Sequence, residues 1–404
     1  MWLALATALA ADWPRLQGTE TAADPPTVRP WGFVQGLGEG IVGGPPVTGL
    51  TAPALEPFEG QRAAFNRVGS GDATWGFSVR RARAGLRGAI PGTDGRISWM
   101  LSAELGDNGL TRTSPVVLTD ASVTASYVPG ARLRVGQFKL PLGEEALEMN
   151  PIAAEFVSFS EATRQLLLES PISKGAYTGG VSGFRDVGVQ AFDSFVLGSG
   201  ELGYAVMVSN GRMGTLEIDD AKDVTARVAW SPWVWGERTA ARRDEVGGYA
   251  FWQQGSRDLD GERAPRVRRG AGVKLEKDGW RARIEVLQAS GMLESGSNPP
   301  FPGQPVRVAT HGQAVGGHAF LHYGHGHAAG GVRYDTLWRG TDTPSDLRIF
   351  QTVTLDAQAV LNPRARLLVD YELRWLGAPH ASDDARTIAR TLGDRVSVQA
   401  VAVF

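Results

Sequence analysis

The sequence predicts an all-β protein: a transmembrane antiparallel β-barrel of about 16 strands, with a long inward-folded loop that carries short helices. Three observations support this prediction. Apolar and polar residues alternate with a period of two along most of the chain. The connections between the alternating segments are short and long in turn. The last segment ends in an aromatic residue at the final position.

The alternation is clearest in three segments from distant parts of the chain. In Arg96–Gly106, Thr119–Val128 and Arg364–Trp375, every second residue is apolar and most of the residues between them are polar. Successive side chains of a strand point to opposite faces, so each segment has one apolar and one polar face. These segments are therefore expected to be strands that separate two different environments.

The connections predict how the strands are joined. Short turns are expected at residues 90–95, 128–131, 276–280 and 361–365, and longer Gly- and Pro-rich loops at residues 106–115, 141–183, 255–268 and 291–311. Short turns after even-numbered strands and long loops after odd-numbered strands are typical of bacterial outer-membrane barrels. The break at Ser231–Glu245 is longer than the other short turns and fits this scheme least well.

A soluble β-sandwich or propeller is the competing fold, and the aromatic residues argue against it. Trp and Tyr recur on the apolar faces near strand ends, at Trp99, Tyr127, Trp230, Trp280, Tyr334 and Trp375. Barrels in membranes place such residues in girdles at both interfaces. The last segment, Arg395–Phe404, alternates to its end and resembles the terminal strand of bacterial outer-membrane proteins.

The chain divides into a short leader and one large domain. Residues 1–10 are predicted to be an atypical signal peptide, because the apolar run ends in Ala8-Leu9-Ala10 but has no basic residue before it. Residues 11–29 are expected to be an N-terminal extension and residues 30–404 a single barrel. No later stretch is apolar over 18 residues, so no transmembrane helix is expected.

Composition excludes several classes of function. The net charge of −2 argues against a nucleic-acid-binding protein, and the absence of cysteine excludes disulfides, thiolate zinc sites and cysteine nucleophiles. Gly36–Gly43 is glycine-rich but precedes a Pro-rich loop rather than a helix, so it is no phosphate-binding loop. We expect neither an enzyme nor a cofactor.

The arginines are the candidate functional residues. In Trp75–Ile90 the alternation slips at Arg80-Arg81, as at a β-bulge, and this slip turns Arg80 or Arg81, together with Arg83 and Arg87, toward the interior. Alternation also turns Arg134, Arg227, Arg283 and Arg333 inward. Guanidinium groups bind phosphate and carboxylate, so these residues form either an anion path or a mixed-charge lining without selectivity.

Histidines gather between His311 and His327. The density allows a metal site, with His318, His322, His325 and His327 as weak candidate ligands. However, His318 and His322 share a strand face whereas His325 and His327 fall near a turn. A histidine-rich turn is the alternative.

The segment from Pro141 to Gly183 is the long loop. Residues 144–149 and 156–169 are predicted to form short helices, and Ser158 or Ser160 is expected to cap the second. We predict that the loop folds into the lumen and narrows the pore; the alternative is an external cap over the barrel mouth. Before the loop, strict alternation would turn Lys139 toward lipid. A slip at Gly136-Gln137 would instead turn Gln137 and Lys139 inward and Phe138 outward.

Three motifs resemble the phosphate-selective porin O and P family. They are FSVRRARAGLRG (Phe77–Gly88), GQFKLPLGEEAL (Gly136–Leu147) and FRDVGVQ (Phe184–Gln190). The resemblance implies a sixteen-stranded, trimeric outer-membrane porin whose third external loop folds inward. It also implies that Lys139, Arg80, Arg81, Arg83 and Arg185 face the pore and attract anions. Only five of the 41 basic residues are lysine, so this chain departs from a lysine-rich anion path.

The predicted function is an outer-membrane porin: a water-filled passive diffusion channel for small hydrophilic solutes, leaning to anions such as phosphate. Its expected partners are outer-membrane lipid, small hydrophilic or anionic solutes and two further copies of the chain, with no nucleic acid. Two alternatives remain. One is an exported soluble or membrane β-protein that binds metal through His311–His327, and the other is a plugged barrel with an adhesion or assembly role.

Overall fold

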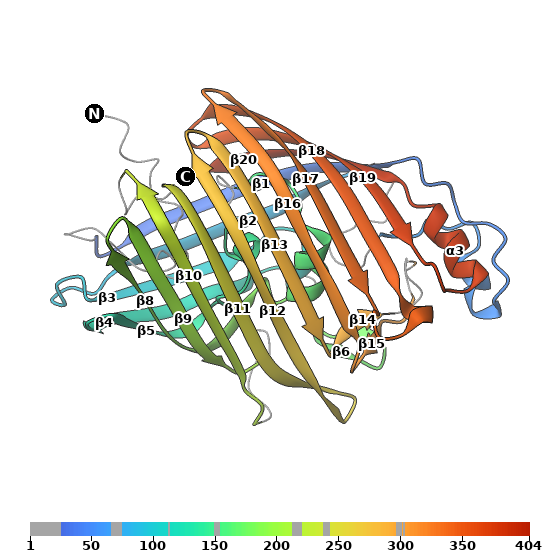
Figure 1. Cartoon of the computed structure of the whole chain (residues 1–404), viewed down its shortest axis with the longest axis horizontal. Coiled ribbons are helices and arrows are strands. Elements are labelled where there is room, and N and C mark those ends of the chain that lie inside the picture. The colour runs from blue at the N-terminus through green and yellow to red at the C-terminus, as the bar shows by residue number, and fades with distance from the viewer. Residues whose placement is uncertain are drawn as a thin grey trace.

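The computed structural model describes residues 26–65, 75–111, 114–148, 154–211, 220–236, 243–295, 301 and 304–404. Within this part of the chain, sixteen antiparallel strands form one closed barrel, as predicted (Figure 1). The predicted signal peptide and most of the N-terminal extension lie outside the described residues. No helix in the described ranges is long and apolar enough to cross a membrane.

The sixteen barrel strands follow one another around the barrel in chain order. The first eight are β1 (Arg29–Val42), β2 (Trp75–Ala89), β3 (Ile97–Glu104), β4 (Val117–Val128), β5 (Ala131–Lys139), β8 (Arg185–Leu197), β9 (Gly200–Ser209) and β10 (Asp223–Trp235). The others are β11 (Asp244–Leu259), β12 (Glu262–Lys277), β13 (Trp280–Ser290), β16 (Gln313–His325), β17 (Ala328–Arg339), β18 (Arg348–Asn362), β19 (Ala365–Gly377) and β20 (Asp394–Val403).

The remaining elements lie in the connections. Two small sheets consist of β6 (Ile172–Ser173) with β7 (Ala176–Tyr177) and β14 (Leu293–Ser295) with β15 (Arg307–Ala309). The helical elements are α2 (Glu144–Glu148), α3 (Asp383–Arg390), the π-helical turn η3 (Thr163–Leu167), and the 3₁₀ turns η1 (Pro53–Phe58), η2 (Gly109–Thr111) and η4 (Pro344–Asp346).

The barrel closes where its first and last strands pair. The register of β1 with β20 runs from Phe33 opposite Val403 to Val42 opposite Asp394. Beyond it, the backbones of Gly32 and Phe404 exchange two hydrogen bonds of 3.0 Å. A Cβ at Gly32 would lie 2.5 Å from the Phe404 ring, so this position requires glycine for the terminal ring to lie against β1. The closure leaves no strand edge open in the barrel.

Alternation separates an apolar exterior from a polar interior. The exposed large side chains on the strands are mostly apolar, among them Phe77, Leu101 and Val135. Five of the six predicted girdle residues are more than a third exposed: Tyr127, Trp230, Trp280, Tyr334 and Trp375. Charged side chains such as Glu104, Asp370 and Arg333 are instead almost completely buried inside. This distribution is that of a barrel whose outer face meets lipid.

The predicted alternation of short turns and long loops holds except between β11 and β12. Residues 255–268 were expected to form a long loop, but both strands continue to a tight turn in which Leu259 pairs with Glu262. Asp260 and Gly261 both have positive φ, 54° and 91°, as a two-residue hairpin requires. The prediction was wrong because outward residues such as Asp258 and Arg263 are polar, as are the inward Arg257 and Arg266, so this part of the sheet lacks an apolar face.

The strands β10 and β11 explain the irregular Ser231–Glu245 segment. Strand β10 continues to Trp235 and β11 begins at Asp244, with a register shift between Trp230 and Trp233. Much of the segment is therefore strand rather than turn. Residues 237–242 lie outside the described part of the chain.

Several connections pack together at the end of the barrel opposite the C-terminus (Figure 1). Val47, Phe301 and Ile388 form a small buried apolar cluster there. Helix α3 adds a polar tie, because the Asp384 carboxylate accepts hydrogen bonds from the backbone N–H groups of Thr51 and Ala52, both at 2.8 Å. The first and last long connections are thereby joined.

Candidate functional site inside the barrel

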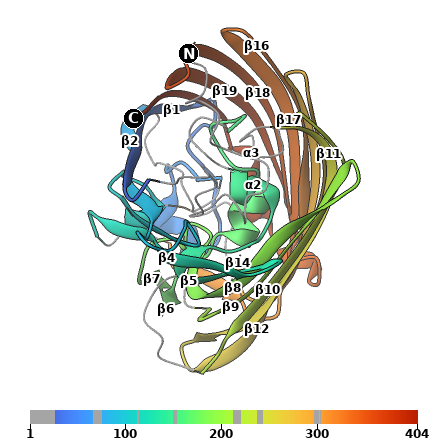
Figure 2. The ribbon, with the colours of Figure 1, turned by 90° about the vertical axis from the view of Figure 1, so that its left-hand side faces the viewer.

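The long connection between β5 and β8 packs against the inner face of the barrel. In the view of Figure 2, α2 lies within the ring of strands. Leu142, Leu166 and Leu167 of this connection belong to one buried apolar cluster with inward-facing residues of the strands, including Tyr249 and Phe251 of β11. The term inner loop is used below for residues 140–184.

The inner loop contains both predicted helical regions, but the second is shorter than predicted. The first is α2. Helical structure in the second covers residues 161–167 instead of 156–169, and residues 156–160 are not helical. Ser160 caps it, as one of two expected candidates: its Oγ accepts from Thr163 N at 3.3 Å. The Ser160 N–H and Oγ–H both donate to the Glu145 carboxylate, which fixes the bend to α2.

Acidic side chains of the inner loop bind basic side chains of one wall of the barrel, from β10 to β17. Glu144 pairs with Arg227 and, at 2.7 Å, with Lys274. Glu145 pairs with Arg333 at 3.2 Å, and the other pairs are Glu148 with Arg283 and Glu155 with Arg281. The wall also binds the backbone of the loop, since the Glu285 carboxylate accepts a hydrogen bond from the Glu144 N–H group. We call this side of the barrel, from β10 to β17, the anchoring wall.

Further along the inner loop, Glu169 binds Arg257 and Arg266. Burial alone would raise the pKa of the Glu169 carboxyl, but attraction by the two guanidinium groups is stronger and lowers the pKa to about 2. Arg257 also binds both carboxylate oxygens of Asp223 at 2.8 Å. These ion pairs thus hold the end of the inner loop against the extended β11–β12 hairpin.

The opposite side of the loop faces a cavity of about 150 Å³. Six basic side chains and two acidic ones line this cavity: Arg80, Arg81, Arg83, Lys139, Arg164 and Arg185, with Glu39 and Asp107. Five of the six cations stand on β2, β5 and β8. We call this side of the barrel the cationic wall.

A bulge in β2 places adjacent arginines on the cationic wall. Gln35 of β1 pairs with Arg81 and Gly36 pairs with Val79, so Arg80 is the extra residue, as the slip at Arg80-Arg81 predicted. Both arginines line the cavity, whereas Val79 remains on the exterior. Arg83 follows two residues later on the same inner face. The bulge therefore brings three guanidinium groups to the cavity from four residues of one strand.

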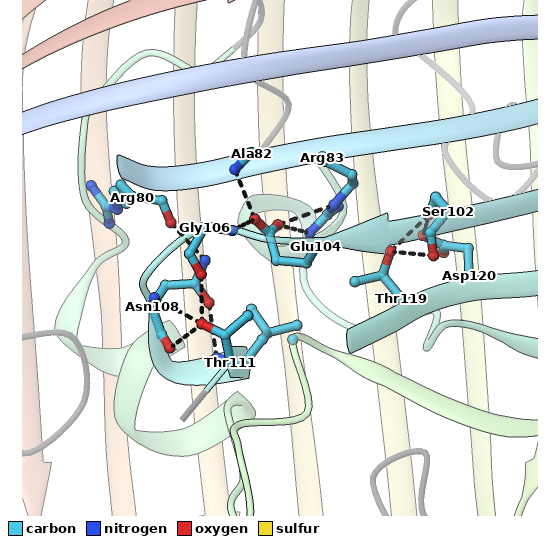
Figure 3. Close-up of polar contacts among 12 residues, drawn as sticks. Arg80, Ala82, Arg83, Ser102, Glu104, Gly106, Asn108, Thr111, Thr119 and Asp120 are labelled. Carbon is cyan, nitrogen blue, oxygen red and sulfur yellow. Dashed lines mark hydrogen bonds and ion pairs between the residues drawn. The ribbon is translucent and has the colours of Figure 1, made fainter. Parts of the chain in front are cut away.

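Two of the cations on this wall are matched by acids. The Arg83 Nη2–H donates to Glu104 at 2.8 Å, and Glu104 also accepts from the backbone N–H groups of Ala82 and Gly106 (Figure 3). The Arg185 guanidinium donates twice to Asp120, at 3.1 Å each. Asp120 in turn accepts from Ser102 at 2.7 Å (Figure 3).

Three other cations of this wall make contacts without a carboxylate. Arg80 Nη1–H donates to the Val157 carbonyl at 2.9 Å, and Lys139 Nζ donates to the carbonyls of Ala146 and Leu147 at 3.0 Å. The Arg81 guanidinium lies 5.9 Å from the centre of the Phe159 ring. Among the described residues, none of Arg80, Arg81 and Lys139 has a carboxylate oxygen within 4.0 Å. The cavity therefore keeps an excess of positive charge.

Lys139 reaches the interior by a route that differs from the predicted slip. The pairing of β5 with β4 and β8 is continuous through Gly136 and Gln137. Phe138 is buried in the apolar cluster of the inner loop, and the Gln137 amide donates to the backbone carbonyls of Leu118 and Thr119 in β4, so the predicted orientation of both residues was wrong. Lys139 is the last residue of its strand. Its chain turns inward directly afterwards, which carries the ammonium group to α2.

The remaining predicted pore residues occupy varied positions. Arg134 is 1% exposed and lies over the rings of Phe138 and Phe192, with Thr124 accepting from its Nε–H at 3.2 Å. Arg87 is on the inner side of β2 opposite Arg29, away from the cavity lining. Arg227, Arg283 and Arg333 belong to the anchoring wall. Arg164 was not among the predicted residues, because only the fold of the inner loop brings it to the cavity.

The histidines do not converge. His318 and His322 are buried inside the barrel, whereas His325 and His327 are exposed at the turn between β16 and β17. His322 Nε2 lies 3.1 Å from an oxygen of Asp356. In the ranges that the structure describes, no group of three or more His, Cys, Asp or Glu residues is arranged to hold a metal ion.

Comparison with known proteins agrees with this geometry. Residues 60–196 match the model of the phosphate-selective porin O and P family. The chain has a porin fold. The match covers β2 with its bulge, the complete inner loop and β8, so it includes all of the cationic wall. Together with the closed barrel, it indicates a channel protein of the bacterial outer membrane. A search of curated protein sequences finds no match.

Solved porins share the fold at low sequence identity. OmpF of Salmonella typhi, in complex with daunomycin, has a TM-score of 0.59 and 13% identity over 93% of this chain and 97% of its own. An anion-selective porin from Comamonas acidovorans has a TM-score of 0.57 and 12% identity over 94% of this chain and 100% of its own. The outer-membrane channel DcaP of Acinetobacter baumannii has a TM-score of 0.52 and 13% identity over 96% of this chain and 99% of its own.

Proposed function

We propose that this porin is a passive diffusion channel that prefers anions, with the cationic wall as its selective surface. The observation that carries the proposal is the charge imbalance at the cavity, which six basic and two acidic side chains line. Three of the cations have no acidic partner among the described residues. A surface of one sign with low-dielectric walls raises the local concentration of the opposite ion, so small anions are favoured over cations.

The anchoring wall supports the same proposal. Its basic residues are occupied by the acids of the inner loop, so they are not available to a solute. Arg80, Arg81 and Lys139 contact the loop only through carbonyl groups and the Phe159 ring, so the solute path would follow the cavity that these three residues line. In this proposal passage needs no energy source, because the solute moves down its own concentration gradient.

The test is electrical measurement of the purified protein in planar lipid bilayers. We expect discrete conductance steps, and in a KCl gradient we expect a reversal potential that indicates preference for chloride. Arg80→Gln with Arg81→Gln should lower the chloride-to-potassium permeability ratio at least threefold, since each unit charge contributes about 1 kcal/mol at 4 Å in water. Arg263→Gln, on the exposed part of β12, is the control and should change little.

The outcomes separate the alternatives. Absence of conductance steps from correctly folded barrels would support a plugged barrel instead of a channel. Potassium preference would contradict the anion preference but leave the channel assignment in place. An unchanged ratio in the double variant would mean that the selective surface lies elsewhere in the lumen.

We also propose that the barrel is a trimer whose contact face includes β20, β1 and β2. The outward positions there combine small residues, among them Gly36, Gly38, Ala84, Ala400 and Ala402, with Phe77, which is 93% exposed and which a second barrel would cover. Light scattering in mild detergent should give a protein mass three times that of the 43.1 kDa chain. A monomeric mass would contradict this proposal alone.

A further inference from the structure

The cavity at the cationic wall is charged on one side and apolar on the other. Five of its cations project from the barrel wall, as described above. Facing them are apolar side chains of the inner loop and of the connection between β3 and β4: Leu110, Ala146, Phe159, Leu168, Val181 and Phe184. A ligand in this cavity would meet guanidinium and ammonium groups at one end and hydrocarbon at the other.

We propose that this cavity binds small organic carboxylates, with the carboxylate at the β2 arginines and the apolar body against the inner loop, in preference to inorganic phosphate. The inference rests on the proposed function, because it requires that the cationic wall attract anions. It adds the chemical class of the ligand.

The chemistry of the lining distinguishes the two ligands. Phosphate carries oxygens on all sides, so at this site some would lose water against Phe159, Leu168 or Val181 without gaining a hydrogen bond. A carboxylate on a hydrocarbon or aromatic body has its charge at one end only. Its body removes apolar surface from water where phosphate would bury polar atoms. The apolar half of the cavity therefore favours the organic ion.

Arg81 is placed to bind a planar anionic group. Its guanidinium lies 5.9 Å from the Phe159 ring centre, whereas Arg83 already donates its Nε–H and Nη2–H to Glu104. A guanidinium group held near a ring can still offer N–H donors at its edge, and paired N–H donors match the two oxygens of a carboxylate. The cavity of about 150 Å³ is about five times the volume of a water molecule in the liquid, which suits an anion of benzoate size.

Block of the chloride current by added anions tests this inference. Benzoate, butyrate and inorganic phosphate are compared at pH 7 on the intact protein in planar bilayers. We expect the half-blocking concentration of benzoate to be at least tenfold below that of phosphate, with butyrate between them. Phosphate carries the larger charge at this pH, so electrostatic attraction alone would give the opposite order. Uncharged benzamide should not block.

Variants locate the effect. Val181→Thr with Leu110→Asn makes the apolar side polar at nearly constant size, and should reduce the tenfold difference to less than threefold. Val208→Thr makes the same valine exchange on the outer face of β9, where the side chain is 48% exposed, and should leave the difference unchanged. Stronger block by phosphate than by benzoate, no block by either, or an unchanged ratio in the double variant would overturn the inference.

The same recordings separate this inference from the proposed function. A channel that prefers chloride but shows no advantage for benzoate retains the proposed function and loses only the ligand class. A channel that prefers potassium in a KCl gradient loses the proposed function itself.

Discussion

The two sides of the barrel interior use the same residue type for different purposes. On the anchoring wall, arginines and Lys274 each meet an acid of the inner loop, so their charges are neutralised and buried. On the cationic wall, Arg80, Arg81 and Lys139 meet carbonyl groups or an aromatic ring, and among the described residues no acid neutralises them. The partner of an inward arginine, rather than its direction, thus decides whether it can act on a solute.

This division also explains how a chain with a net charge of −2 can have a strongly cationic cavity. Six of the 43 acidic residues lie on the inner loop, and five of these six pair with basic residues of β10 to β17 rather than with the cavity cations. A global charge balance therefore carries little information about the pore, because the fold separates the charges in space.

The largest effect that tests this comparison is expected at Lys274. Its Nζ lies 2.7 Å from Glu144 and 2.6 Å from Glu245, and all three side chains are buried. Lys274→Met would leave two buried carboxylates short of a partner, at a cost of roughly 3–5 kcal/mol. Glu144 keeps its contact with Arg227, and Glu245 keeps its contact with Arg243. The cost should therefore lie near the lower end of this range.

Urea titration of the folded barrel in lipid vesicles, followed by gel mobility without boiling, measures this free energy. Lys277→Met on the same strand is the matched control: its side chain is 45% exposed, so the change should cost below about 1 kcal/mol. Equal effects of the two variants would show that the anchoring wall contributes no special stability.

The next effect is a pH dependence at Glu169. Its pKa falls from 4.5 to about 2 in the folded protein, so its contribution to stability is complete above pH 4.5 and is lost as the pH falls toward 2. The shift corresponds to roughly 2–3 kcal/mol of the free energy of unfolding. This figure takes into account that Arg257 is shared between Glu169 and Asp223. Urea midpoints between pH 6 and pH 2 should fall less in Glu169→Gln than in the wild type. Parallel curves for the two proteins would contradict the pairing.

The sequence was sufficient to predict the barrel because alternation is a local property. A lipid-facing side chain must be apolar whatever its neighbours, so most strands could be read one at a time. The bulge at Arg80-Arg81 was visible for the same reason. The β11–β12 hairpin was missed because both faces of its outer part are polar.

The site was less predictable because its pairs are distant in the sequence. Glu144 and Lys274, or Glu148 and Arg283, lie 130 and 135 residues apart, and no local pattern connects them. Alternation placed Arg227, Arg283 and Arg333 inside correctly. It does not show that acids of the inner loop pair with these arginines. Arg134 faces inward but is covered by two phenylalanine rings. For Lys139, the expectation of an inward cation matched the structure, whereas the proposed slip at Gly136-Gln137 did not.

The smallest expected effect sharpens the comparison most directly, because it applies one substitution to both walls. Glu104→Gln keeps the shape of the side chain beside Arg83 but removes the charge that neutralises it at the cavity. The chloride-to-potassium permeability ratio should rise about twofold to fivefold, since one unit charge at 4 Å in water corresponds to about 1 kcal/mol. Glu148→Gln removes a charge from the pair with Arg283, and neither of these residues lines the cavity. The chloride-to-potassium permeability ratio of Glu148→Gln should change less than twofold, because charges beyond about 8 Å are screened at physiological salt. Reversal potentials of the two variants in the same KCl gradient give the comparison, and a larger change for Glu148→Gln would reverse the roles assigned to the two walls.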